Sequence, residues 1–207
     1  MERKFVITIG RQLGSGGKRV GEMLSKQLNI PCYDKELIRL ASKESGLCKE
    51  FFEKADEKSG FSFIGNLFGI SPLGGDVYAD NYLRNESLFK IQSDVIRELA
   101  ERQSCIFVGR CADYILRDYP LLFNVFISAN IEDRIKRVDF PEKFSKEKIT
   151  QMLEQADKKR AAYYNYYSNK TWGMAASYDL CINSSVLGIE ETVAYIRHFA
   201  EKKFDFT

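Results

Sequence analysis

The chain has 207 residues, of which 44% are hydrophobic and 29% charged, with a formal net charge of +2. This length suits one core-bearing domain with an appended lid or insertion, and the composition argues against extensive disorder. The net charge is close to neutral, which predicts no nucleic-acid or membrane partner. The sequence contains no run near the roughly 20 apolar residues of a membrane span, so we expect a cytoplasmic protein.

The first predicted elements are a strand over residues 5–9 and a helix over 17–29, joined by a glycine-rich turn. The turn contains Gly14, Ser15, Gly16 and Gly17. Glycines allow successive backbone N–H groups to converge on a phosphate, and the following helix directs its positive N-terminal end toward the same anion. We therefore predict a phosphate-binding loop; a glycine-rich turn without a ligand is the alternative.

Two alignments of this loop with known patterns are possible. The pattern G-x-x-x-x-G-K-[ST] would require a glycine at position 12 and a hydroxyl at position 19, where the chain has Gln12 and Arg19. The pattern G-S-G-K-[GS]-T instead matches residues 14–16, which puts Gly17 at the lysine position and leaves Lys18 and Arg19 one and two residues further on. Both alignments keep the loop and differ in where its cation lies.

The remaining strands and helices alternate along the chain. Strands are predicted around 32–33 and at 104–108, 122–128 and 179–183, and helices at 35–45, 48–57, 86–103, 131–138, 145–167 and 188–203. Nearly continuous apolar strands that alternate with helices are typical of a parallel sheet covered on both faces, so we predict a three-layer α/β fold. Ligands of such sheets bind beyond the carboxyl ends of the strands, where the loops after the strands should meet in one crevice.

Two segments stand apart in composition. Residues 59–80 are rich in glycine and aromatic residues without a sustained period, which is typical of a mobile insertion or a cover over a binding site; contact with a partner is the alternative. Residues 155–172 combine basic side chains with four tyrosines. A solvated helix face is the simplest interpretation of that charge run.

Basic residues follow several predicted strands. They are Lys18, Arg19, Lys35, Arg39 and Arg110, joined by Arg160 from the later basic helix. Phosphoryl transfer needs little covalent help from a protein, but it needs fixed cations and hydrogen-bond donors around the phosphates. A single arginine after a strand is usually a surface residue. The shared position of these cations at one edge of the predicted sheet nevertheless favours phosphoryl transfer.

Five motifs in this order resemble the cytidylate kinase-like proteins, a branch of the nucleoside monophosphate kinases. They are residues 7–17 (ITIGRQLGSGG), 33–38 (YDKELI), 108–114 (VGRCADY), 157–164 (DKKRAAYY) and 178–183 (YDLCIN). The resemblance implies an α/β, three-layer P-loop nucleoside-kinase fold with a parallel sheet, forming a single domain over residues 1–207. It also implies a helical acceptor-binding insertion at about 35–100, a lid at about 139–172, ATP as donor and Mg²⁺ as cofactor.

The same resemblance assigns roles to individual residues. On the donor side, the loop glycines and Ser15 would hold the β-phosphate of ATP. Lys18 or Arg19 would neutralise the charge of that phosphate, and Arg134 and Arg137 would stack against adenine. On the acceptor side, Arg110 would hold the acceptor's phosphate and Asp113 would lie near its base. Asp34 would lie near both the acceptor and the magnesium, and the other expected acceptor residues are Lys35 and Arg39. The lid cations would be Arg160 with Lys158 or Lys159. Lys18, Arg110 and Arg160 are the expected catalytic groups.

The chain also departs from the family pattern. The usual lysine and hydroxyl of the loop are displaced or missing, and that hydroxyl is ordinarily a magnesium ligand. Val108 and Cys111 stand where cytidylate kinases have the two aspartates of D-G-R-D. We expect phosphoryl transfer from ATP to a nucleoside monophosphate such as CMP. The alternatives are a kinase for another small acceptor and a nucleotide-binding regulatory protein with weak or no turnover.

Overall fold

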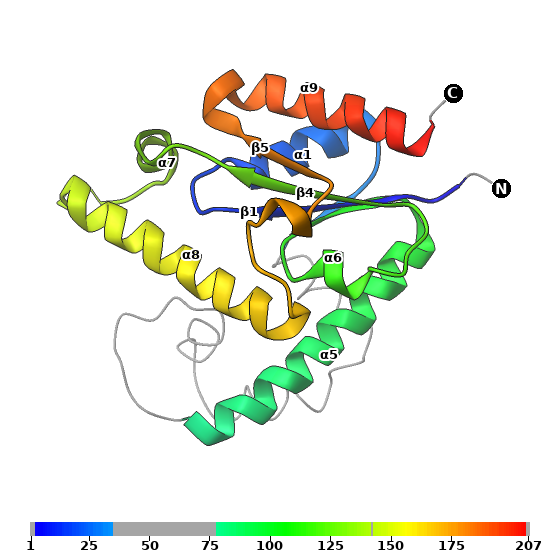
Figure 1. Ribbon diagram of the computed structural model, residues 1–207, viewed down its shortest axis with the longest axis horizontal. Coiled ribbons are helices and arrows are strands. Elements are labelled where there is room, and N and C mark those ends of the chain that lie inside the picture. Colours follow the sequence, from blue (N-terminus) through cyan, green and yellow to red (C-terminus); the bar gives the residue numbers. More distant parts are fainter. Residues whose placement is uncertain (1–2, 35–77, 142, 206–207) are drawn as a thin grey trace.

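The computed structural model describes residues 3–34, 78–141 and 143–205, which form a layered α/β structure (Figure 1). Within these residues, five strands make one sheet in the order β2-β3-β1-β4-β5. Every pair of neighbours in this order is parallel, from β2 with β3 to β4 with β5. The predicted parallel sheet is therefore confirmed.

The strands lie close to their predicted positions. They are β1 (Val6–Arg11), β2 (Cys32–Tyr33), β3 (Cys105–Val108), β4 (Leu122–Ser128) and β5 (Leu180–Asn183). The largest difference is at β1, which runs two residues beyond the predicted end because Gly10 and Arg11 still pair with Phe126 and Ile127 of β4. Arg11 is therefore a strand residue at the carboxyl edge of the sheet.

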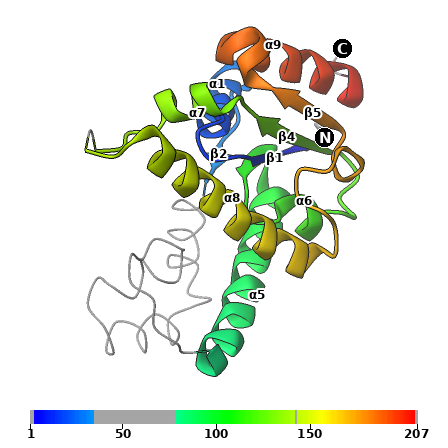
Figure 2. The same ribbon diagram turned by 60° about the vertical axis from the view of Figure 1, so that its left-hand side comes forward.

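Two helical layers cover the sheet because consecutive strand residues point to opposite faces. On one face α1 (Gly17–Leu28) and α9 (Ser184–Phe204) pack over a core that includes Ile106 and Val108 of β3. On the other face α5 (Tyr78–Arg102) and α6 (Ala112–Ile115) pack over Cys105 and Phe107 of the same strand. The arrangement confirms the predicted three layers, and both views show α1 and α9 together on one side (Figure 1, Figure 2).

Three further elements follow β4. They are α7 (Ile131–Arg137), α8 (Lys146–Ser168) and the short 3-10 helix η1 (Ala175–Ser177). Figure 2 shows α8 on the α5 side of the sheet, with α5 running away from the strands. Phe89 of α5 stacks on Tyr167 of α8 with ring centroids 3.9 Å apart, which joins these two helices.

Some helix boundaries differ from the predicted ones. The helix predicted at 188–203 is the greater part of α9, which starts four residues earlier and is kinked at Gly188 (φ 82°, ψ 176°). The four-residue α6 and the three-residue η1 were not predicted because a single turn is too short to show a period. The predicted helices 35–45 and 48–57, and residues 59–77, lie outside the described residues. In the described part of the chain, no helix is both long and apolar enough to cross a membrane.

Candidate phosphate-binding site

The glycine-rich loop connects β1 to α1 through two left-handed residues. Gly14 has φ 79° and Gly16 has φ 82°, and α1 begins at Gly17. Ser15 between them is fully buried, and its N–H and hydroxyl both donate to the carbonyl of Gln12, at 3.3 and 2.9 Å. Because left-handed residues strongly favour glycine, this geometry matches Gly14-Ser15-Gly16 to the G-S-G pattern and puts Gly17 where that pattern has lysine.

A buried ion pair contacts the main chain of the glycine loop at Leu13. Asp157 of α8 accepts a hydrogen bond from the N–H of Leu13 at 2.8 Å through Oδ1, and its Oδ2 pairs with Arg134 of α7. The Nε of Arg134 donates to the carbonyl of Leu13 at 2.7 Å. Since both side chains are almost fully buried, α7 and α8 fix the position of the loop's main chain.

Arg134 and Arg137, the residues predicted to contact adenine, both contact the loop. Arg134 is 5% exposed and directs its guanidinium at Leu13 and Asp157. Arg137 donates to the hydroxyl of Ser184 at 2.9 Å, and that hydroxyl donates to the carbonyl of Ser15 at 2.7 Å. The structure therefore shows loop contacts for both arginines, and their contact with adenine stays a prediction.

Three arginines from different elements meet beside the loop. Arg160 of α8 donates through Nη1 to the carbonyl of Arg11 at 3.1 Å. Burial, followed by the charges of Arg160 and Arg110, lowers the pKa of Arg11 to about 9, while Asp34 acts in the opposite direction. Burial also lowers the pKa of Arg160. The carboxylate of Asp157, 4.0 Å from Nη1 of Arg160, acts in the opposite direction, and the charge of Arg110 adds to the effect of burial. Three guanidinium groups thus concentrate positive charge at this edge of the sheet, which attracts anions.

Lys18 and Asp34 form an ion pair at the edge of this group. The ammonium of Lys18 lies 2.8 Å from Oδ2 of Asp34, which follows β2. Asp34 is the predicted magnesium ligand, and the described residues contain no cluster of three or more histidine, cysteine or acidic side chains. One carboxylate fits Mg²⁺ where phosphate oxygens and water complete the shell, which is the usual arrangement for a nucleotide-bound ion.

Three of the remaining predicted cations are exposed, and two lie outside the described residues. Arg19 is exposed and pairs with Glu190 of α9 at 3.0 Å, and Lys158 and Lys159 are exposed on α8. Lys35 and Arg39 lie outside the described residues. Contacts of these five residues with a substrate stay predictions.

Arg110 follows β3 in an unusual turn. Gly109, Arg110 and Cys111 all have positive φ, at 83°, 64° and 54°. The Arg110 guanidinium carbon lies 5.7 Å from the ring centroid of Tyr163 on α8, within the range of a cation–π contact. The turn therefore brings Arg110 toward α8 and the arginine group.

Asp113, the predicted base-contacting carboxylate, is 6% exposed and accepts a hydrogen bond from the hydroxyl of Tyr164 at 2.7 Å. Burial is the main cause that raises the pKa of Asp113. In this conformation the carboxylate joins α6 to α8. A contact with an acceptor's base stays a prediction and would require this pair to open.

The variant Asp113→Asn is expected to be more stable than the wild type near pH 7. A raised pKa means that the folded state disfavours the charged carboxylate, so the penalty develops as pH rises above the ordinary value of 3.8 through the raised value. Urea unfolding should show an advantage for the variant at pH 7 that shrinks toward pH 4. The matched control Asp118→Asn, at a 90% exposed carboxylate, should change little. Lower stability of Asp113→Asn at pH 7 would contradict this prediction.

Sequence reasoning missed three residues of the site. Arg11 was assigned to the loop without a role, Asp157 was part of a charge run, and Tyr163 was one tyrosine among four. The only local signal was the position of Arg11 directly after an apolar strand, because Asp157 contacts a loop that is 144 residues away in sequence.

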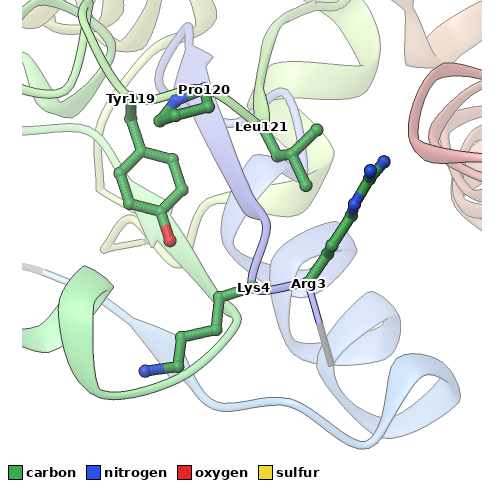
Figure 3. Close-up of a pocket in the computed structure, with 5 residues that line it drawn as sticks. All are labelled: Arg3, Lys4, Tyr119, Pro120 and Leu121. Atoms are coloured by element: carbon green, nitrogen blue, oxygen red, sulfur yellow. The ribbon is translucent and has the colours of Figure 1, made fainter. Parts of the chain in front are cut away.

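A concave region lies at the opposite end of β1 from the arginine group and is lined by Arg3, Lys4, Tyr119, Pro120 and Leu121 (Figure 3). Lys4 donates to the carbonyl of Glu101 at 2.6 Å, and the hydroxyl of Tyr119 donates to the carbonyl of Ala100 at 3.1 Å. These bonds attach the chain before β1 and the loop before β4 to the end of α5. This region is separate from the arginine group.

The protein thus has an α/β fold in which a glycine loop and a group of arginines lie together at the carboxyl edge of a parallel sheet. The sequence matches the model of the cytidylate kinase-like family over residues 6–186, and the chain belongs to that family. This confirms the resemblance seen in the five motifs. No curated protein matches the sequence.

Solved structures share the fold. An uncharacterized protein from Eubacterium ventriosum has 26% identity and a TM-score of 0.69, with 96% of this chain and 99% of that chain covered. Shikimate kinase from Bacteroides thetaiotaomicron has 14% identity, a TM-score of 0.53 and coverage of 95% and 98%. Shikimate kinase from Acinetobacter baumannii, in complex with shikimate, has 14% identity, a TM-score of 0.54 and coverage of 96% and 93%. The fold is that of the P-loop kinases, and the family supports a kinase-like phosphotransferase.

Proposed function

We propose that the protein transfers the γ-phosphoryl group of ATP to a nucleoside monophosphate, with CMP as the first acceptor to test. The observation that carries this proposal is the meeting of Arg11, Arg110 and Arg160 beside a left-handed glycine loop. Phosphoryl transfer depends on fixed positive charge around two phosphate groups, and this arrangement supplies it. The substrates are small nucleotides, and nothing in the proposal requires a nucleic acid or a membrane.

Each part of the site has a task in this reaction. The backbone N–H groups of the loop and of the first turn of α1 would bind the donor's phosphates. Arg110 would hold the acceptor's phosphate, and Arg160 would neutralise charge on the phosphoryl group as it moves between the two substrates. No side-chain base is required, because an acceptor phosphate is already ionised at neutral pH.

Asp34 would hold magnesium together with the phosphate oxygens of ATP. The ion would supply charge neutralisation on those oxygens. The ion pair between Lys18 and Asp34 keeps this carboxylate near the loop, with the Asp34 side chain only 16% exposed. Lys18 would then contact phosphate or metal-bound water from the same position.

The acceptor side supports a second candidate, a kinase for another small acceptor. Val108 is apolar, Cys111 is buried and Asp113 is paired with Tyr164, so the aspartates that recognise cytosine in cytidylate kinases have no direct counterpart in this conformation. Shikimate is a natural test compound, because one of the similar structures is a complex with shikimate. A regulatory nucleotide-binding protein is the third candidate, since Arg19 occupies the position of the loop hydroxyl and pairs with Glu190.

A coupled assay of ADP formation tests the proposal. With ATP and Mg²⁺ present, we expect ADP to form only on addition of an acceptor, with CMP active and the panel completed by dCMP, UMP, AMP and shikimate. Activity with shikimate alone would support the second candidate. ATP binding by calorimetry without turnover on any acceptor would support a regulatory protein, and no ATP binding at all would overturn the proposal.

A further inference from the structure

The loop lacks a side chain at the position where phosphate loops usually have a lysine. The left-handed glycines at 14 and 16 identify that position as Gly17, the first residue of α1. Lys18, the next residue, is 61% exposed and directed to Asp34. A cation that stands over Gly17 itself must therefore come from another position in the chain.

The space above Gly17 is occupied by Arg11. A Cβ atom at position 17 would lie 2.7 Å from Cβ and 2.9 Å from Cγ of Arg11. The stem of Arg11 thus fills the volume that a side chain at position 17 would need. A side chain at position 17 and the Arg11 side chain would therefore occupy the same space. The chain has arginine at the end of β1 and glycine at the start of α1.

The head of the same side chain reaches the end of β3. A Cβ atom at Gly109 would lie 2.0 Å from Nη1 of Arg11, so the guanidinium lies against the backbone of Gly109. Gly109 has φ 83° and directly precedes Arg110. The Arg11 side chain therefore crosses from the loop to the Arg110 turn, between the expected donor and acceptor phosphates.

Among the described residues, more cations than carboxylates act on Arg11. Arg160 and Arg110 oppose its charge, and Asp34 favours it. Such a partly buried like-charge group is destabilising by itself and is typical of a site built for an anion. Arg134 is the contrasting case of a structural arginine, whose guanidinium contacts the carbonyl of Leu13 and the carboxylate of Asp157.

We propose that Arg11, at the end of β1, is the cation that contacts the donor's phosphates, in place of the lysine that this chain lacks at position 17. This inference rests on the proposed function and deepens it, because it names the residue that binds the polyphosphate. Its ligand is a nucleoside triphosphate or diphosphate, and Gly17 and Gly109 are glycines because the Arg11 side chain passes over both.

The test compares ATP, ADP and AMP binding to the full chain, with AMP measured as a competitor of ATP so that only the donor site is observed. Arg11→Met keeps the stem over Gly17 and removes the guanidinium. We expect it to lower ATP affinity about 10- to 100-fold, the loss of a charge-assisted hydrogen bond, while AMP affinity changes little. Arg11→Lys should recover part of the ATP affinity. The control Arg197→Ala, at an exposed arginine of α9, should leave all three affinities unchanged.

A double-mutant cycle adds a steric test. Gly17→Ala places a methyl group against the Cβ and Cγ atoms of Arg11. In the wild-type background this variant should lower ATP affinity, because the methyl group displaces the guanidinium. In the Arg11→Met background it should cause no further loss of ATP affinity, because no guanidinium is left to displace. The melting temperature without ligand should stay constant or rise in Arg11→Met, because like-charge repulsion is relieved, whereas loss of a structural arginine would lower it.

The outcomes separate this inference from the proposed function. If the wild type binds ATP and Arg11→Met keeps the same preference for ATP over AMP, Arg11 is not the phosphate cation while the proposed function stands. An additive result in the double-mutant cycle, or a lower melting temperature of Arg11→Met with unchanged ATP affinity, would overturn the inference in the same way. If the wild type does not bind ATP, both fail.

Discussion

Replacing Arg160 with alanine is expected to lower turnover by about 100-fold or more, the loss typical of removing one donor that stabilises transition-state charge. Arg160 reaches from α8 to the carbonyl of Arg11, and its side chain is 31% exposed beside the arginine group. Because only interactions that strengthen in the transition state accelerate the chemical step, ATP affinity in the ground state should fall much less than turnover. Steady-state kinetics with an active acceptor, together with calorimetry for ATP, measure the two effects separately.

The matched control for this variant is Lys148→Ala. Lys148 is an exposed cation on the same helix, away from the loop, so its removal tests the effect of net charge on α8. We expect unchanged turnover in Lys148→Ala. Normal turnover in Arg160→Ala would return this basic run to the simple interpretation of a solvated helix face, and equal losses in turnover and ATP affinity would assign Arg160 to ground-state binding.

Replacing Asp157 with alanine is expected to lower the free energy of unfolding by about 3–5 kcal/mol, because it leaves the buried charge of Arg134 without its partner. The N–H of Leu13 loses its acceptor at the same time. For a protein of this size the change corresponds to a fall in melting temperature of roughly 6–20 °C. Calorimetry or urea unfolding without ligand measures it.

Two further variants separate charge from shape. Asp157→Asn keeps an oxygen for the N–H of Leu13 and removes the negative charge, so it should cost less than Asp157→Ala. The double variant Arg134→Met with Asp157→Leu removes both charges of the pair and should be more stable than Asp157→Ala, since the buried charge of Arg134 is no longer left unpaired. A loss below about 1 kcal/mol in Asp157→Ala would show that this ion pair behaves like an exposed one.

The sequence predicts the sheet well because its strands are buried on both faces. The β3 segment Cys105–Val108 is apolar at every position, and the structure buries all four residues between the two helical layers. This pattern is local, so it is visible without knowledge of the partners. The short helix α6 has no such signal, since it depends on the left-handed turn at Gly109, Arg110 and Cys111.

The candidate site was predicted in part. The loop glycines, Asp34 and Arg110 follow predicted strands, whose carboxyl ends meet at one edge of a parallel sheet. Arg160 lies in a predicted helix. The roles of Arg134 and Asp157 could not be predicted, because their pairing depends on how α7 and α8 pack under a loop more than a hundred residues earlier. The family resemblance suggested a nucleotide contact for Arg134, and the structure shows a contact with the loop.

The sequence by itself determined the order of strands and helices, the glycine loop and the family, since each of these is carried by residues adjacent in the chain. Only the tertiary structure decided which cation stands over that loop. Position 17 is glycine in the sequence, and the space above it is filled by Arg11, whose side chain also lies against Gly109 at the end of another strand. Steric exclusion between side chains from separate elements appears only once β1, α1 and β3 are packed together, so residue spacing along the chain contains no sign of it.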